Sequence, residues 1–163
     1  MEIHILRHAI ADPANPGESD ADRALTPDGK KRLRDVLKVA RSAGLAPSLI
    51  LTSPYRRAVE TAEIAASQLG FQDEPLRTNA LLPGSSAEDI WEEIRVHKDA
   101  EELLLVGHEP LLGQLAAYLL GAPNMLIDFK KGAIIRIDME QFSTEPRGVL
   151  RWYFTPKLAG KVG

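Results

Sequence analysis

Cysteine is missing from this sequence. Its absence excludes disulfide bonds, thiol catalysis and metal sites built on cysteine. It is compatible with the reducing cytoplasm, which is where we expect the protein to act. Long apolar runs are missing as well, because the longest one, around residues 115–120, is far shorter than a membrane span. The N-terminal segment has neither the cationic start nor the long apolar run of a signal peptide, so we expect no association with a membrane.

A strong excess of charge of one sign is also missing. The chain of 163 residues has 20 lysines and arginines against 23 aspartates and glutamates, which gives a formal net charge of −3. This balance provides no basic footprint for nucleic acid or for an anionic membrane. The charge clusters are small and scattered, and they predict no dimer interface. A chain of this length, without repeats or linkers, is typical of one domain, so we expect residues 1–163 to fold as a single unit.

What the sequence does contain is a set of short apolar runs that end in polar residues. Residues 2–7 lead into His8, residues 48–52 lead into Ser53, and residues 102–107 lead into His108. Short apolar runs of this kind are typical of buried parallel strands. Open α/β sheets bind their ligands just beyond the carboxyl ends of such strands. We therefore expect the chemistry of this protein at that edge of the sheet.

Helix-like segments separate the apolar runs. Thr26-Pro27 supplies a capping hydroxyl and a proline for the start of the first helix, and apolar residues then recur at helical spacing. Two β-like segments, residues 132–139 and 149–154, close the chain and predict an antiparallel pair. The order of elements predicts an α/β fold, a three-layer sandwich with a mainly parallel central sheet, an antiparallel edge and helices on both faces.

Two histidines and two arginines are expected to meet at the carboxyl edge of this sheet. They are Arg7, His8, His108 and one of the pair Arg56 and Arg57, whose inward-facing member the periodicity does not decide. A bidentate arginine matches the oxygens of a phosphate group. A neutral imidazole can act as the nucleophile in phosphoryl transfer, while positive groups stabilise the oxygens of the transferred group. The set therefore predicts a pocket for a dianion.

Metal binding is the competing explanation of the two histidines. His108-Glu109 is not followed by a second histidine four residues later, as the zinc-protease helix requires, and no carboxylate sits beside His8. We therefore expect neither a metal nor another cofactor. His4 lies four residues before His8 on the same predicted strand, and we expect it to be a buried, hydrogen-bonded histidine.

Four segments resemble, in order, the motifs of the histidine phosphatase (phosphoglycerate mutase-like) superfamily. Residues 6–9 resemble its Arg-His-Gly signature, residues 25–29 its Leu-Thr/Ser-x-x-Gly segment, residues 52–61 its Ser-x-x-x-Arg-Ala-x-x-Thr segment, and residues 106–110 its second-histidine motif. Ala9 stands where the signature has glycine, which is a small change. The short chain, Ser53-Pro54 and the segment 23–29 are most similar to the SixA-type phosphohistidine phosphatases.

The resemblance implies a role for each residue of the pocket. It makes His8 the nucleophile that becomes phosphorylated, Arg7 and Arg57 the ligands of the phosphoryl group, and His108 a further contact that stabilises the transition state. It also selects Arg57 over Arg56, because Arg57 is the arginine that fits the motif. The activity so implied is that of a phosphatase with a phosphohistidine enzyme intermediate.

Two further basic residues are candidates for substrate binding. Arg23 lies near the end of a polar segment, residues 12–25, and Lys131 lies just before the predicted pair of final strands. A solvated surface is the alternative interpretation of both side chains.

An acid that could protonate the leaving group is missing from the place where larger members of the superfamily carry one. Residues 79–84 contain no carboxylate. An alkoxide leaves poorly without a general acid, which commonly contributes 10²–10⁴-fold to the rate. A phosphohistidine needs less help because its P–N bond is labile. The absence favours a phosphohistidine substrate, although Glu18, Asp20, Asp22 or Glu109 could supply a proton.

The sequence thus predicts a metal-independent phosphatase that removes phosphate from phosphohistidine on a partner phosphotransfer protein. One alternative is a general phosphomonoesterase that acts on small phosphate esters. A second alternative is a non-catalytic module that binds phosphoproteins, which the presence of all four pocket residues disfavours.

Overall fold

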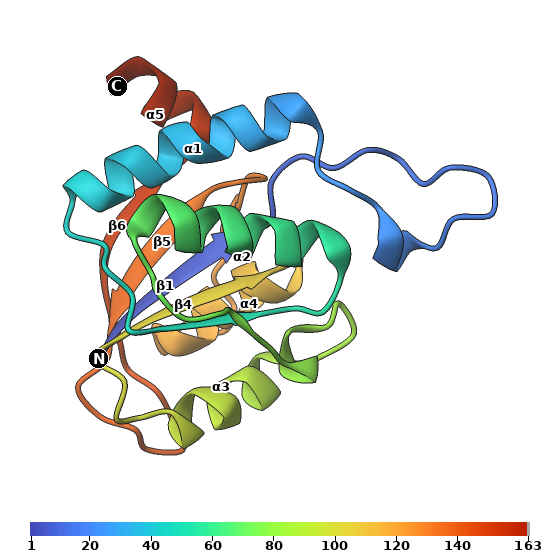
Figure 1. Cartoon of the computed structure of the whole chain (residues 1–163). Helices are drawn as coiled ribbons and strands as arrows, with labels where there is room; N and C mark the ends of the chain where they lie inside the picture. Colours follow the sequence, from blue (N-terminus) through green and yellow to red (C-terminus); the bar gives the residue numbers. More distant parts are fainter. Residues whose placement is uncertain (163) are drawn as a thin grey trace.

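The computed structural model describes residues 1–162 and is built around a six-stranded sheet with the strand order β3-β2-β4-β1-β5-β6 (Figure 1). The strands are β1 (Glu2–Arg7), β2 (Leu49–Thr52), β3 (Leu76–Arg77), β4 (Glu102–Gly107), β5 (Ile134–Asp138) and β6 (Val149–Phe154). β1 to β4 run parallel to one another, whereas β5 is antiparallel to β1 and to β6. The predicted parallel sheet with an antiparallel edge is confirmed.

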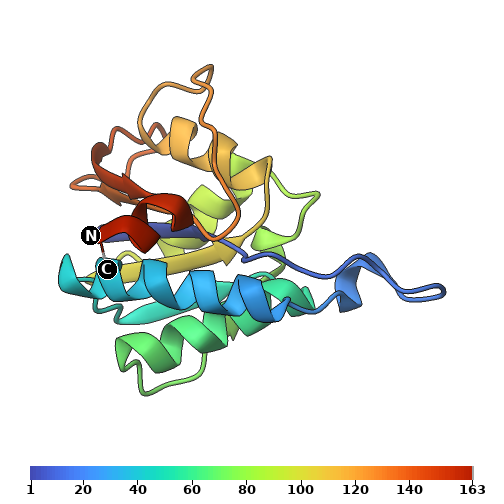
Figure 2. The same ribbon diagram turned by 90° about the horizontal axis from the view of Figure 1, so that it is seen from above.

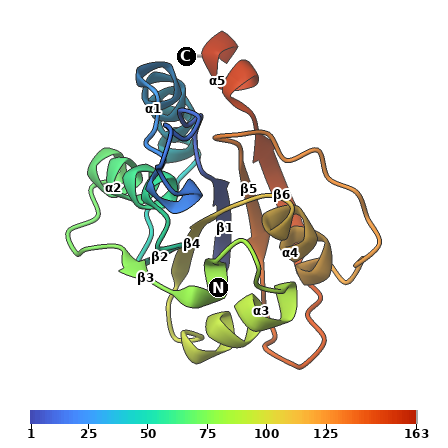
Figure 3. The same ribbon diagram turned by 90° about the vertical axis from the view of Figure 1, so that its right-hand side faces the viewer.

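Helices cover both faces of the sheet (Figure 3). One face carries α1 (Pro27–Ser42), α2 (Arg56–Leu69) and α5 (Pro156–Val162), and the other carries α3 (Ala87–Val96) and α4 (Leu111–Leu119). Two short 3₁₀ turns, η1 (Asp20–Asp22) and η2 (Asn79–Leu81), lie in the loops. The sequence analysis did not anticipate α5, which packs on α1. None of the described helices has the length and apolar character needed to cross a membrane.

Strand β1 shows why the sheet is buried on both faces. Ile3 and Ile5 point into the core beneath α3 and α4, whereas Leu6 points into the core beneath α1 and α2. All three side chains are fully buried. Each such side chain contributes about 1.5–3 kcal/mol to stability through its removal from water. This double burial fixes the register of β1 and therefore the position of the residues that follow it.

The carboxyl ends of the parallel strands meet at one edge. The backbone N–H of His8 donates to the carbonyl of Gly107 (2.9 Å), and that of Ser53 donates to the carbonyl of Val106 (3.0 Å). The loop between β1 and α1 extends beyond this edge (Figure 2). Its two ends lie together, because the backbone N–H of Thr26 donates to the carbonyl of Ile10 (2.9 Å), and any side chain at Gly29 in the first turn of α1 would collide with that same oxygen. The loop is thereby held close to the end of β1.

Candidate active site

His8 follows the last residue of β1 and is 6% exposed. Its Nδ1 lies 2.8 Å from the carbonyl oxygen of Ala9. A carbonyl oxygen only accepts, so Nδ1 carries the proton and Nε2 keeps its lone pair. Burial lowers the pKa of His8 to about 3, and the charges of Arg57 and Arg7 lower it as well. The ring is therefore neutral near pH 7, with Nε2 in the form a nucleophile requires.

Arg57 lies in the first turn of α2 and points into the site. Its Nε donates to Nε2 of His8 (3.3 Å), and its side chain is 7% exposed. Arg56 is exposed instead and pairs with Glu60 on the outer face of the helix (2.9 Å). Thr61, one turn further along α2, accepts from the backbone N–H of Ala9 (3.2 Å) and donates to the carbonyl of Arg57 (2.7 Å). Thr61 thus ties α2 to the end of β1.

His108 follows β4 and lies against His8, with ring centroids 5.2 Å apart. Its Nε2 is 2.7 Å from the hydroxyl of Ser53, and the backbone N–H of Tyr55 donates to that hydroxyl (3.3 Å). Burial lowers the pKa of His108 to about 4, with a further contribution from the charge of Arg57. Two neutral imidazole rings therefore share one buried pocket.

Arg7 completes the set of four residues and leaves part of its hydrogen-bonding capacity unused. Its Nη1 donates to the carbonyl of Phe129 (2.8 Å). Its Nε, like Nδ1 of His108, is buried and has no hydrogen-bond partner within residues 1–162. A buried polar atom without a partner costs about 1–3 kcal/mol, and such atoms are rare unless a ligand uses them. The arrangement is suited to an anion with several acceptor oxygens.

Asp20 brings a carboxylate into the site from η1. Arg57 donates through Nη1 to the backbone carbonyl of Asp20 (2.7 Å) and through Nη2 to its carboxylate (3.1 Å). A hydrogen bond from Arg23, together with the charge and hydrogen bond of Arg57, holds the pKa of Asp20 below its usual value. Asp20 is therefore ionised in this arrangement. Nothing in the spacing of the sequence indicated that this carboxylate would reach Arg57 across a loop.

The two remaining basic candidates take different positions. Arg23 donates to the carboxylate of Asp20 (3.0 Å) and to the carbonyl of Asp12 (2.8 Å), so it holds the loop that carries Asp20. Lys131 lines a cavity of about 280 Å³ beside Ala9. The cavity lies between α1 and the start of α5, has a largely apolar wall, and is bordered by four cationic side chains, those of Arg32, Lys130, Lys131 and Lys157.

Glu109 is a second carboxyl group near the site. It follows His108 directly, and its carboxylate accepts from the backbone N–H of Gly113 in α4. Burial raises the pKa of Glu109, and the hydrogen bond from Gly113 and the charge of Arg7 oppose that increase. Of the carboxyl groups that could supply a proton, Glu109 is thus easier to protonate than Asp20.

His4 departs from its predicted state in one respect. It is fully buried, as expected, but neither ring nitrogen has a hydrogen-bond partner within residues 1–162. The prediction of a hydrogen-bonded histidine was wrong because the neighbouring strands use their carbonyl groups in the sheet. Burial lowers the pKa of His4 to about 4. His4 projects from the middle of β1 and takes no part in the pocket around His8.

The buried basic pocket at the carboxyl edge of the α/β sheet is suited to a phosphoryl group, and comparison with known proteins identifies the protein as a phosphatase and shows its family. Residues 3–82 match the family model of the histidine phosphatase superfamily (branch 1). A phosphohistidine phosphatase SixA homolog of Haemophilus influenzae is 33% identical over 133 residues, which cover 76% of this chain and 80% of the relative. An uncharacterized protein of Picosynechococcus is 36% identical over 137 residues, or 83% of each chain. The chain belongs to the histidine phosphatase superfamily.

Solved structures show the same fold. The protein histidine phosphatase SixA complexed with tungstate has a TM-score of 0.86 at 23% identity, covering 97% of this chain and 99% of that chain. A putative phosphohistidine phosphatase SixA from Agrobacterium tumefaciens has a TM-score of 0.78 at 21% identity, covering 95% and 98%. The mycobacterial glucosyl-3-phosphoglycerate phosphatase has a TM-score of 0.70 at 18% identity, covering 92% and 96%. Phosphatases with different named substrates therefore share this architecture.

Proposed function

We propose that this phosphatase removes the phosphoryl group from phosphohistidine on a partner phosphotransfer protein and passes it through His8 to water. The main support is the state of His8, a buried neutral imidazole whose Nε2 lone pair lies within 3.3 Å of Arg57. Such a group can attack phosphorus at neutral pH without prior loss of a proton. The role of the protein would be to end a signal that is carried by a phosphoryl group on histidine.

In the first step, Nε2 of His8 attacks phosphorus and the P–N bond of the substrate breaks. The departing imidazole leaves after it has taken up a proton from solvent water. The donors for the three phosphoryl oxygens would be Arg57, Nε of Arg7 and Nδ1 of His108, of which the last two have no partner within residues 1–162. His108 donates through Nδ1 in the tautomer whose Nε2 accepts from the hydroxyl of Ser53. Arg57 would exchange the carboxylate of Asp20 for phosphoryl oxygens. Fixed donors of this kind commonly contribute 10²–10³-fold each.

In the second step, water attacks the phosphorus of phosphorylated His8. The P–Nε2 bond breaks, its electron pair returns to Nε2, and the proton lost by the water passes to solvent or to the departing phosphate. The hydrogen bond from Nδ1 to the carbonyl of Ala9 would hold the ring in place through both steps. Because that bond fixes the tautomer, Nε2 would be ready for the next cycle.

The choice of phosphohistidine rests on the acids near the site. Asp20 is held ionised by two arginines, and residues 79–84 offer no carboxylate. A protonated imidazole is a good leaving group and does not depend on a fixed acid, whereas an alkoxide does. The apolar cavity with its cationic border, next to Ala9, also suits the acidic surface of a protein better than a small ester.

A general phosphomonoesterase is the second candidate, and Glu109 favours it. Burial raises the pKa of this carboxyl group, and it follows His108 directly. A protonated Glu109 could serve as the acid that an ester substrate needs. Glu109→Gln separates the two candidates, because it should slow the hydrolysis of alkyl phosphates about 10²-fold or more and leave phosphohistidine turnover within a few-fold.

The test compares substrates directly, with EDTA present. The purified protein receives a phosphotransfer domain that carries phosphohistidine, p-nitrophenyl phosphate, or a panel of sugar phosphates. His8→Ala is the inactive control, and His97→Ala, which removes a partly exposed histidine on the outer side of the fold, is the matched control. Rapid loss of phosphate from the domain alone supports the proposal. Preference for the small esters overturns it, and tight binding without turnover of any donor would indicate a binding module.

A further inference from the structure

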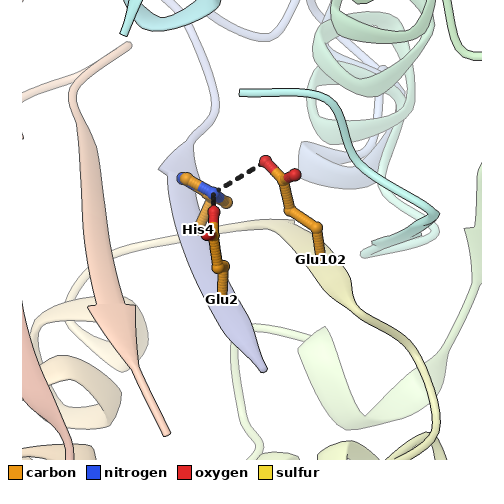
Figure 4. A group of neighbouring side chains, drawn as sticks. All are labelled: Glu2, His4 and Glu102. Atoms are coloured by element: carbon orange, nitrogen blue, oxygen red, sulfur yellow. Dashed lines mark ion pairs between the residues drawn. The ribbon is translucent and has the colours of Figure 1, made fainter. Parts of the chain in front are cut away.

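Glu2, His4 and Glu102 converge at the edge of the sheet opposite the phosphatase site (Figure 4). Glu2 and Glu102 are paired in register at the starts of β1 and β4, and His4 follows two residues later on β1. Residues two apart on a strand share a face, so all three side chains lie together. Within residues 1–162, this is the one group of three or more histidine and carboxylate side chains whose ligand atoms lie within 4.8 Å of one another.

His4 is the unexplained member of this cluster. Nε2 lies 3.0 Å from Oε1 of Glu102 and 3.7 Å from Oε2 of Glu2. The shorter contact is nevertheless not a hydrogen bond, because the oxygen lies away from the direction of an N–H bond on Nε2. A fully buried imidazole that lies beside two carboxylates without a hydrogen bond to either calls for an explanation.

The positions of these atoms match the ligand shell of a metal ion. Two ligands of a tetrahedral Zn²⁺ ion, each bound at about 2.0–2.1 Å, lie about 3.3 Å apart. The two distances from Nε2 of His4 fall on either side of that value. In such a shell the metal lies in line with the imidazole nitrogen, and the other ligands lie off that line. Nε2 of His4 and Oε1 of Glu102 are therefore close enough to bind the same ion.

We propose that Glu2, His4 and Glu102 form a binding site for a divalent transition-metal ion such as Zn²⁺, with water as the fourth ligand. One imidazole and two carboxylates suit Zn²⁺ and its neighbours better than Mg²⁺ or Ca²⁺, which prefer oxygen ligands alone. An ion can reach the site from solvent, since the side chains of Glu2 and Glu102 are 39% and 14% exposed. The ring of Trp152 packs 5.4 Å from that of His4 and holds it in position.

The groups around the cluster leave carboxylate oxygens of Glu2 and Glu102 available to a metal ion, but one of them, Arg136, is a cation that competes with the ion for Glu2. Glu102 accepts one backbone N–H bond, from Ala46 to Oε1 (2.8 Å). Arg136 lies 2.8 Å from Oε1 of Glu2, so the other oxygen faces His4. Asp138 already holds Arg136 through two hydrogen bonds (2.8 and 3.1 Å). Arg136 can therefore lose its contact with Glu2 and still keep Asp138 as a partner. Its positive charge nevertheless repels a bound cation. Its removal should tighten metal binding several-fold.

A bound ion would join the starts of β1 and β4, which are far apart in the sequence. An ion that binds only the folded state raises the melting temperature by mass action. At a concentration one hundred times the dissociation constant, we expect a rise of about 5–10 °C for a chain of this length. Mg²⁺ at the same concentration should have little effect.

The experiment titrates the metal-free full chain with ZnCl₂ and follows the imidazole nitrogens by NMR. One equivalent of Zn²⁺ should shift the Nε2 resonance of His4 and raise the melting temperature. His4→Phe and Glu102→Gln should each weaken zinc binding at least tenfold, and Arg136→Gln should strengthen it. The matched control is His97→Ala, which removes the other histidine–glutamate contact, 3.4 Å from Nε2 to Glu93, and should leave the affinity unchanged.

Two outcomes would overturn the proposal. One is a His4 resonance that does not move while those of His8, His97 or His108 do, which would assign the zinc to another site. The other is zinc binding that persists unchanged in His4→Phe. The NMR measurement on the unaltered chain keeps the test independent of how well the variants fold. The proposal does not depend on the phosphatase reaction, because neither readout is catalytic.

Discussion

His4 and His8 lie four residues apart, His4 within β1 and His8 just beyond its carboxyl end, and the nearest charged groups differ in sign. Both rings are buried, and burial lowers the pKa of His4 to about 4 and of His8 to about 3. His8 is anchored through Nδ1 by a carbonyl and faces arginines, whereas His4 has no hydrogen bond and faces carboxylates. Burial therefore makes both rings neutral, and the neighbouring charges decide whether the site suits an anion or a cation.

Loss of His8, the proposed nucleophile, gives the largest expected effect at the basic end of the strand. His8→Ala should lower turnover of phosphohistidine on the order of 10⁴–10⁶-fold, because it removes the imidazole nitrogen that forms the proposed covalent intermediate. The measurement is the release of phosphate from a labelled phosphotransfer domain. Substantial remaining activity would mean that water attacks the substrate directly, so that His8 would not be the nucleophile that distinguishes this end of β1 from the end near His4.

The two arginines of α2 offer a matched pair. Arg57→Ala removes the donor next to Nε2 of His8 and should lower kcat/KM about 10²–10³-fold. Arg56→Ala removes an exposed partner of Glu60 and should change kcat/KM less than three-fold. Steady-state kinetics on the same substrate checks both variants. Equal losses of kcat/KM would show that the positive charge at the start of α2, and not the contact of Arg57 with His8, determines the rate.

The buried histidines should make the protein sensitive to acid. The folded state keeps His8 neutral down to a pKa of about 3, whereas the unfolded chain takes up a proton near pH 6.5. Unfolding then binds protons between these values, so stability is fully present above pH 6.5 and falls as the pH falls toward 3. At pH 5 the loss from His8 is about 2 kcal/mol. Urea unfolding at pH 7 and pH 5 measures it.

The matched variant for this measurement is His8→Asn, which should lose that share of the pH dependence. If the free energy of unfolding depends on pH equally in the variant and in the unaltered chain, His8 has the same pKa in the folded and unfolded states. The comparison between variants is needed because burial also raises the pKa of Glu102 and Glu109. These two carboxyl groups raise the free energy of unfolding as the pH falls, whereas His8 lowers it.

The smallest expected effect concerns the carboxylate at the basic end. Asp20→Asn removes a negative charge that occupies Arg57, so inorganic phosphate should bind about two- to five-fold more tightly. Inhibition of turnover by phosphate provides the measurement. Asp22→Asn is the control, because Asp22 in the same turn accepts from Ser19 and makes no contact with Arg57. Weaker phosphate binding in Asp20→Asn would show that Asp20 orders the loop instead of competing for Arg57.

The sequence predicted the parts of the molecule that depend on local pattern. Apolar runs and helix caps identified the strands and the main helices, and the resemblance selected Arg57 over Arg56 at a point where periodicity could not. Contacts between segments that lie far apart in the sequence could not be predicted from it. The spacing gave no sign that Asp20 would cross a loop to Arg57, or that Glu102 would lie beside His4, because both depend on how the sheet brings remote segments together.

The carboxylate of Asp20 also sets a condition on which anions can enter the site. Arg57 already has a singly charged partner, held by hydrogen bonds at 2.7 and 3.1 Å to one residue. A competing monoanion, such as a small carboxylic acid, would replace one single charge with another and gain little. A phosphoryl dianion brings twice the charge and more acceptor oxygens, so it gains from the exchange. The site thereby discriminates by the charge of the ligand before any feature of the substrate is recognised.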